Sequence, residues 1–150
     1  MRIPTLALAL LAATASAAPA STQEDRLGDL TVRAAWAAPS SLSRRTGSVY
    51  LTIANGGPRD DQLIAAHTDA AEETELRSHR TGEVVGRARR VSAVRLPAAQ
   101  TVVLKPGAEH VALIDVKTPL KPGDQLSLLL MFEKSGLLTV SVPVVAAAPN

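Results

Sequence analysis

The sequence predicts an all-β protein, built as an antiparallel β-sandwich or barrel. Eight or nine short apolar segments, each of strand length, recur at spacings of about ten residues along the chain. Proline and glycine separate these segments, and no long segment carries the 3.6-residue period of an amphipathic helix. Short strands with turn signals between them are typical of sandwiches and barrels.

Each expected strand is bounded by residues that favour turns. Segment 47–54 alternates β-branched and aromatic residues and ends at the turn-forming letters NGGP, whereas 39–45 is a loop by composition. The letters LKPG occur twice, and each occurrence predicts a tight turn, because proline presets φ and glycine supplies the positive φ that follows. Residues 70–73 suffice for one helical turn. The expected strands are 30–36, 47–54, 62–66, 73–78, 91–96, 101–104, 110–116, 125–133 and 137–145, with a return segment starting at 84–85.

The first residues have the pattern of a secretory signal peptide, which we place with its cleavage region at 1–20. Arg2 is the positive n-region, 6–13 is the apolar h-region, and Ala15-Ser16-Ala17 is the cleavage site. The apolar run is shorter than the about 20 residues that span a bilayer, so we expect no membrane span in the mature chain. The rest divides into a flexible leader (21–28), one folded domain (29–146) and a tail (147–150).

Composition excludes several classes of function. The chain has no cysteine, and this removes disulfides, thiolate metal sites, cysteine nucleophiles and a lipid-modified cysteine together. Cleavage after Ala17 would remove Arg2 alone of the charged residues, leaving 15 of the 16 basic side chains against 14 acidic ones. Binding to nucleic acid, which needs a basic surface, is therefore not expected.

Large apolar side chains are few, and we assign them to the core. Beyond Met1 the only methionine is Met131, in the apolar run LSLLLMF, where it is expected to fill space. The chain has three aromatic residues of the Phe, Trp and Tyr types. The residues assigned to core packing are Trp36, Tyr50, Leu113, Met131 and Phe132.

The order of short motifs along residues 29–145 resembles the PCu(A)C family of periplasmic copper chaperones. The motifs are LTVRAAW (30–36), VYLTIAN (49–55), QLI (62–64), EL (75–76), LKPGAEH (104–110), LKPGD (120–124) and FEKSG (132–136). The resemblance implies a cupredoxin-like antiparallel β-sandwich of Greek-key type and a periplasmic location. It also implies delivery of copper, chiefly Cu(I), with respiratory oxidase assembly proteins as partners.

The copper motif of that family is largely replaced in this chain. A gap-free alignment puts Arg77 and His79 on the first histidine and methionine, Ala88 on the next methionine, and His110 and Ala112 on the last pair. Only His110 keeps its ligand type, since guanidinium and methyl groups cannot coordinate. Without thioethers, tight Cu(I) binding is not expected.

Two imidazoles remain as candidate metal ligands. His79 and His110 could hold Cu(II) or Zn(II) weakly, with water completing the coordination, if the fold brings them together. The alternative is a structural role for each: His79 as a turn residue in solvent, and His110 as a strand-edge residue bonded to a backbone carbonyl. His67 matches no motif position and is expected to be exposed.

Arginines cluster beside the candidate metal ligands. Arg77, Arg87 and Arg89 are the candidate residues for binding an anion or an acidic partner protein, because guanidinium binds carboxylate and phosphate in bidentate fashion. The alternative is a solvated edge strand that its charges keep from aggregating. Six arginines lie within 77–95, the others being Arg80, Arg90 and Arg95.

Catalysis is not predicted. The chain has no G-x-S-x-G nucleophile elbow, no H-E-x-x-H metalloprotease motif and no glycine-rich phosphate loop. Two classes of function therefore remain open, a copper-handling protein with an eroded site and an exported recognition module without metal.

Overall fold

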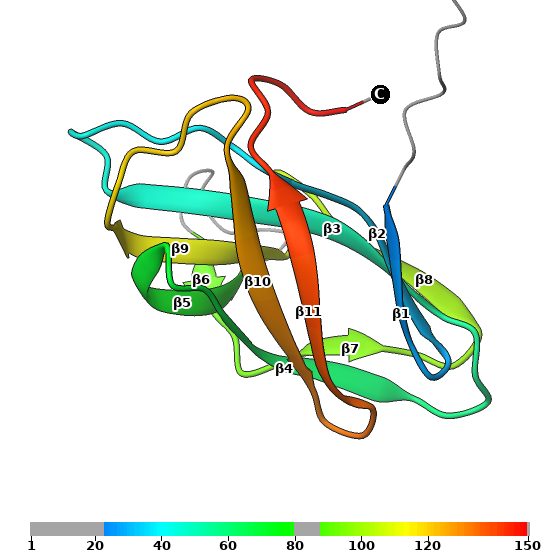
Figure 1. Ribbon diagram of the computed structural model, residues 1–150. Coiled ribbons are helices and arrows are strands. Elements are labelled where there is room, and N and C mark those ends of the chain that lie inside the picture. The colour runs from blue at the N-terminus through cyan, green and yellow to red at the C-terminus, as the bar shows by residue number, and fades with distance from the viewer. Residues whose placement is uncertain (1–22, 80–87, 150) are drawn as a thin grey trace, which may run out of the picture.

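The computed structural model describes residues 23–79 and 88–149, and this part of the chain consists of strands, turns and loops without a helix (Figure 1). Among the described residues, no helix is long and apolar enough to cross a membrane. The strands are β1 (Glu24–Leu27), β2 (Leu30–Ala37), β3 (Thr46–Asn55), β4 (Asp61–His67), β5 (Ala71–Ser78), β6 (Arg89–Arg90), β7 (Val94–Leu96), β8 (Gln100–Leu104), β9 (His110–Val116), β10 (Gln125–Phe132) and β11 (Gly136–Pro143).

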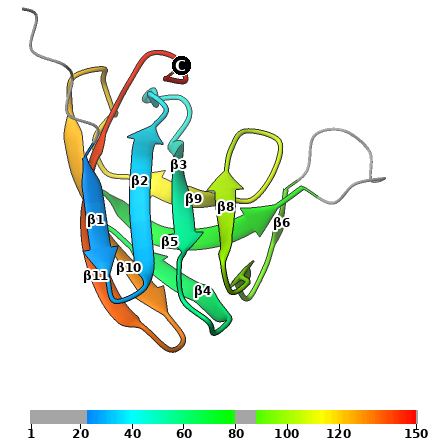
Figure 2. The same ribbon diagram turned by 90° about the vertical axis from the view of Figure 1, so that its right-hand side faces the viewer.

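The strands form two antiparallel sheets that pack face to face, so the predicted β-sandwich is confirmed. The seven-stranded sheet has the order β1-β2-β3-β9-β5-β6, with β8 also paired to β3, and the four-stranded sheet has the order β11-β10-β4-β7. In Figure 1, β10 and β11 lie in front of β3 and cross it steeply. Figure 2 shows the molecule from the side, with β2 and β3 toward the viewer. Neighbours such as β3 and β9 are far apart in sequence, as in Greek-key arrangements.

The core is made of aliphatic side chains from both sheets. Strands β3 and β10 alternate buried and more exposed residues, which is the period of two expected when one face of a sheet is covered. Burying each such side chain stabilises the fold by about 1.5 to 3 kcal/mol. Leu113 and Phe132 are buried as predicted. The largest fully buried side chains are Leu30, Leu51, Ile53, Leu63, Leu96, Leu104, Leu113, Leu128 and Leu130.

Three of the residues assigned to the core do not lie there. Met131 is 38% exposed, because its neighbours on β10, Leu130 and Phe132, take the inward positions. Trp36 and Tyr50 are half-buried and face outward from the seven-stranded sheet, where they form a cross-strand pair. The apolar run predicted strands correctly but not which face each side chain takes.

The ends of several elements also differ from expectation. Part of the expected flexible leader is wrong, because Glu24–Leu27 is strand β1, paired with β2 through a turn in which Gly28 has a φ of 57°. The expected helical turn at 70–73 is wrong as well, since strand β5 begins at Ala71. Segment 91–96 is strand only over β7, where Val94 and Leu96 face inward. The signal peptide at 1–20 and the return segment at 84–85 lie outside the described residues.

A buried carboxylate holds the turn between β10 and β11 against β4. The Asp61 side chain, 5% exposed, accepts hydrogen bonds from the backbone N–H groups of Gln62, Lys134 and Ser135 at 2.8, 2.9 and 3.1 Å, and from the Ser135 hydroxyl. Burial alone would raise the pKa of Asp61, but the Ser135 hydroxyl and the three backbone donors lower it below 3.8 overall. The charged form of Asp61 therefore stabilises the hairpin.

Candidate metal site around His110

His110 is the first residue of β9 and is placed by the turn that precedes it. In that turn Gly107 has a φ of 80°, and Lys105 and Ala108 close two backbone hydrogen bonds, Lys105 N to Glu109 O at 3.1 Å and Ala108 N to Lys105 O at 3.0 Å. The His110 side chain is 8% exposed, and its Nδ1 lies 3.2 Å from the carbonyl oxygen of Ala108. Since a carbonyl can only accept, Nδ1 carries the proton, and Nε2 of the neutral ring keeps its lone pair.

His79 follows β5 and stacks on His110. The two ring centroids are 5.7 Å apart and the ring planes are inclined by 29°. Register explains the approach, because Arg77 of β5 is paired with His110 of β9, and the Ser78 hydroxyl donates to Glu109 Oε1 at 3.3 Å. The fold thus brings together the two histidines that the sequence selects.

The centroid spacing of the two rings falls in the range of two imidazoles on one ion, but nitrogen lone pairs lie in the ring planes, so the stacked rings must turn before both nitrogens point at the same ion. A metal–nitrogen bond of about 2.0 Å puts the ion about 3 Å from each ring centroid, so two imidazoles on one ion have centroids roughly 5 to 6 Å apart. The bond from His110 Nδ1 to a backbone carbonyl is the usual second contact of a metal-binding histidine. Over residues 23–79 and 88–149, however, no group of three histidine, cysteine, aspartate or glutamate side chains could hold a metal.

The surroundings of His110 keep its ring neutral. Burial lowers the pKa of His110 below its ordinary value of 6.5, and the charges of His79 and Arg77 lower it further. The hydrogen bond to Ala108 opposes this shift without cancelling it. A neutral imidazole with a free nitrogen is the form that binds a metal ion. A metal ion therefore meets less competition from protons at His110 than at an ordinary histidine.

The arginines beside the two histidines are engaged with carboxylates. Arg77 Nε lies 2.8 Å from Glu75 Oε2, and Arg90 Nη1 lies 3.5 Å from Glu75 Oε1 and 3.6 Å from Glu73 Oε1. Arg89 is exposed on the edge strand β6, and Arg87 lies outside the described residues. Positive charge beside the site is therefore partly balanced. Arg77 and Glu75 lie two residues apart on β5, whereas Arg90 of β6 reaches Glu73 and Glu75 through the pairing of β5 with β6, which local sequence does not give.

An aromatic row leads to His110, and sequence reading missed it too. Trp36 and Tyr50 have ring centroids 4.6 Å apart, and Tyr50 and His110 have centroids 6.0 Å apart. With His79 the row crosses from β2 through β3 and β9 to the end of β5. The pairing of Trp36 with Tyr50 depends on the register of β2 and β3, which alternation alone does not give.

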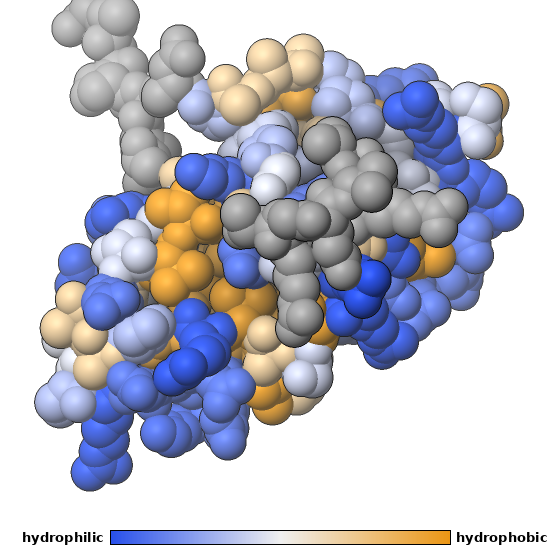
Figure 3. Space-filling view, turned by 180° about the vertical axis from the view of Figure 1, so that it is seen from behind, coloured by the Kyte–Doolittle hydropathy of each residue, from blue (hydrophilic) through white to orange (hydrophobic). Residues whose placement is uncertain are grey.

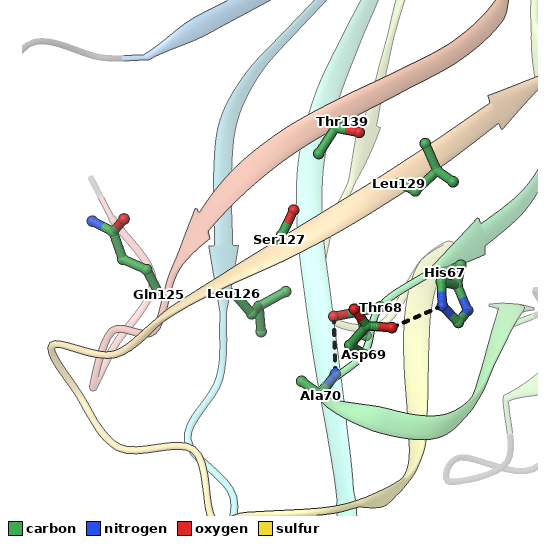
Figure 4. A pocket seen from close by; sticks show the side chains of 9 residues that line it. All are labelled: His67, Thr68, Asp69, Ala70, Gln125, Leu126, Ser127, Leu129 and Thr139. Carbon is green, nitrogen blue, oxygen red and sulfur yellow. Dashed lines mark hydrogen bonds and ion pairs between the residues drawn. The ribbon is translucent and has the colours of Figure 1, made fainter.

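The third histidine belongs to a different place. His67 ends β4 on the four-stranded sheet, and its Nε2 lies 3.3 Å from Asp69 Oδ1 beside a shallow pocket (Figure 4). Both side chains are largely exposed, as was expected for His67. The pocket is lined by His67, Thr68, Asp69, Ala70, Gln125, Leu126, Ser127, Leu129 and Thr139.

Comparison with solved structures defines the class of protein. The chain is 30% identical to "Apo PCuAC domain from PmoF1", with a TM-score of 0.73 over 83% of this chain and 100% of that one. It is 26% identical to apo-DR1885 from Deinococcus radiodurans, with a TM-score of 0.62 over 98% and 97%. "Copper-bound PCuAC domain from PmoF2", at 23% identity, shares the fold with a TM-score of 0.73 over 83% and 99%. The protein therefore has the cupredoxin-like β-sandwich of PCuAC domains, as predicted.

Sequence comparison then gives the particular family. Residues 30–144 match the family described as "Putative lipoprotein LpqE-like". "Putative lipoprotein Lxx21020" of Leifsonia xyli subsp. xyli (strain CTCB07) is 31% identical over 153 residues, covering 96% of this chain and 89% of that protein. The chain belongs to the LpqE-like family.

Proposed function

We propose that this chain is an exported copper-handling protein whose ion is held weakly by His79 and His110. The observation that carries the proposal is the closeness of the two imidazoles, whose centroids are 5.7 Å apart, with His110 Nδ1 bonded to a backbone carbonyl. Similarity to domains described as PCuAC, including one described as copper-bound, supports copper as the cargo. The role is binding and transfer, not catalysis.

The donor set indicates which copper ion is held, and how firmly. Two imidazoles with water suit Cu(II), and Zn(II) equally, whereas Cu(I) is retained by soft thioethers that the aligned positions Ala88 and Ala112 lack. Arg77, on the remaining aligned position, is paired with Glu75 and cannot coordinate. The Cu(I) site of PCuAC proteins is therefore eroded in this chain.

Location and partners follow from resemblance. The lipoprotein descriptions of the family and of its relative support export, and a signal peptide at 1–20 would direct the chain to the periplasm. The printed sequence has no cysteine to carry a lipid. As in PCu(A)C proteins, the partners would be respiratory oxidase assembly proteins.

Titration of purified protein with Cu(II), followed by calorimetry and electron paramagnetic resonance, tests the proposal. We expect one weak site with nitrogen ligands, abolished in His110→Ala and weakened at least about tenfold in His79→Ala. The exposed His67→Ala variant is the matched control and should bind as wild type. Unchanged binding in His110→Ala would place the site elsewhere, and a tight stoichiometric Cu(I) complex that resists a modest chelator would refute the erosion of the site.

The alternative function is recognition of an anion or acidic partner by the arginines at Arg77, Arg87 and Arg89. The exposure of Arg89 on an edge strand favours it, and the pairing of Arg77 with Glu75 weighs against it. Replacing Arg87 and Arg89 with glutamine would then weaken capture of the partner, and metal would have no effect. Capture that depends on His110 instead would favour the copper proposal.

A further inference from the structure

The placement of the aromatic residues points to a use outside the core. The chain has one tryptophan and one tyrosine, and both lie half-buried on the outward face of the seven-stranded sheet, while leucine, valine and isoleucine fill the core. The back of the molecule shows hydrophobic residues gathered among hydrophilic ones (Figure 3), and since tryptophan and tyrosine are not hydrophobic on the scale of that figure, the orange residues are not the two aromatic ones. Half-exposed tryptophan and tyrosine are enriched where proteins bind other molecules, because each offers a rigid apolar surface.

This aromatic row, defined as Trp36, Tyr50, His110 and His79, is continuous. Successive ring centroids are 4.6, 6.0 and 5.7 Å apart, so each ring is adjacent to the next. Its four members come from different strands or strand ends, and a segment lying across β2, β3 and β9 would touch Trp36 and Tyr50 before reaching the histidines. The row thus connects a surface suited to apolar contact with the candidate metal ligands.

Among the described residues, the histidine end of the row has no metal-binding group beyond its two imidazoles. Within the described part of the chain no third histidine, cysteine or carboxylate joins the pair, and nearby Glu75 and Glu109 are engaged with Arg77 and Ser78. Met1 precedes the described residues, and Met131 faces outward from the other sheet. Soft ligands for a cuprous ion at this place would therefore come from another molecule.

A thioether meets both requirements of this surface. Methionine sulfur makes favourable contacts with aromatic rings, worth about 0.3 to 1.5 kcal/mol, and it is also a donor that Cu(I) prefers. A carboxylate would suit neither the aromatic faces nor the cuprous ion. Resting on the proposed function, we propose that the aromatic row docks a methionine-bearing extended segment of a partner protein, whose thioether completes a cuprous site on His79 and His110.

A blocked synthetic peptide with methionine at the centre of glycines tests the proposal, and the same peptide with norleucine is its matched control. Cu(I) affinity of the full protein is measured without oxygen by competition with a chromophoric chelator, with Trp36 fluorescence as a second readout. We expect the methionine peptide to raise the affinity by about tenfold, within the usual range of coupling between ligands, and the norleucine peptide to leave it unchanged.

Variants assign the effect to the row. Trp36→Leu and Tyr50→Leu should each reduce the enhancement by about two- to tenfold, the worth of a sulfur–aromatic contact, while Cu(II) binding by the protein alone is retained. Leu137→Ser removes an apolar side chain, 56% exposed, from the other sheet and should leave the enhancement intact. Circular dichroism confirms that each variant is folded.

The outcomes separate this inference from the proposed function. Equal enhancement by the two peptides, or full enhancement in Trp36→Leu, overturns the docking role of the row while copper handling stands. Copper binding without any peptide effect does the same. Absence of copper binding with and without peptide overturns both proposals, and a copper-dependent dimer in sedimentation shows that a second copy of this chain, not a peptide segment, covers the row.

Discussion

Asp61 and His110 are both buried ionisable side chains with lowered pKa values, yet the causes are opposite. The acceptors of Asp61 are occupied by the Ser135 hydroxyl and by three backbone donors, which favour its charged form. His110 has one hydrogen bond, to Ala108, and its burial disfavours its charged form, as do the nearby charges of His79 and Arg77. In the first case the surroundings stabilise an ion, and in the second they keep a base neutral.

The difference separates structure from function. A carboxylate with satisfied acceptors has little left to offer a ligand, so Asp61 serves the fold by holding a hairpin. A buried neutral imidazole with a lone pair on Nε2 contributes less to the fold and remains able to bind a metal ion. Similar burial and the same direction of shift thus accompany different roles, and the hydrogen-bond partners distinguish them.

The largest expected effect is that of removing the Asp61 carboxylate. Asp61→Ala leaves backbone N–H groups of Lys134 and Ser135 without their acceptor, and we expect the free energy of unfolding to fall by about 2 to 4 kcal/mol. Urea denaturation followed by circular dichroism measures the loss. Asp69→Ala, at an exposed carboxylate in the turn that follows β4, is the control and should change stability by less than about 0.5 kcal/mol. Equal losses in the two variants would contradict the assigned role of Asp61.

In protein without bound metal, His110→Ala should lower the free energy of unfolding far less than Asp61→Ala does, which sharpens the contrast. Because the histidine and the aspartate are both buried, similar losses in His110→Ala and Asp61→Ala would mean that His110 is chiefly structural.

Asp61 and His110 should change the stability of the protein in two different ranges of pH. The pKa of Asp61 lies below its unfolded value of 3.8, so its contribution is present above that value and is lost as pH falls through the folded pKa. The pKa of His110 lies below 6.5, so below pH 6.5 the unfolded state binds more protons and stability declines until the folded pKa is passed. We expect Asp61→Asn to flatten only the first decline and His110→Gln only the second.

Urea midpoints of chelator-treated protein between pH 3 and 8 measure both declines, with His67→Gln as the control for the second. His67 is exposed and should leave the profile of the wild type in place. A decline between pH 6.5 and 5 that persists in His110→Gln would show that another group is responsible.

A feature could be predicted from the sequence when it depends on residues that are close together in the chain, and not when it depends on pairing between distant strands. Turn residues and alternation are local, and they predicted the sandwich and most strands, including β9 with His110 at its start. The helical turn at 70–73 and the part of the 21–28 leader that forms β1 were not predicted correctly, because pairing with other strands decides both, β5 with β9 and β1 with β2. Met131 failed because apolar letters alone do not say which face of β10 is inward.

The candidate site shows the same limit. His79 and His110 were selected by resemblance, but their stacking depends on the register of β5 against β9. The ion pair of Arg90 with Glu75, and the row through Trp36 and Tyr50, join residues of different strands that no local pattern connects. The register between strands that are distant in the chain cannot be predicted from a single sequence.

Thr74 is the third buried polar group to compare with Asp61 and His110, and its replacement should have the smallest effect on stability. Among the described residues its Oγ1 is a buried side-chain atom without a hydrogen-bond partner, so it has neither the donors around Asp61 nor the free position of His110. Valine has nearly the same shape without the hydroxyl, and Thr74→Val should stabilise the protein by about 0.5 to 1.5 kcal/mol, measured by urea denaturation. Copper titration should be unchanged, since Thr74 pairs with Leu113 in the register of β5 with β9, away from the histidines. A loss of stability would mean that the hydroxyl has a partner, such as an ordered water, and that all three buried polar groups are satisfied.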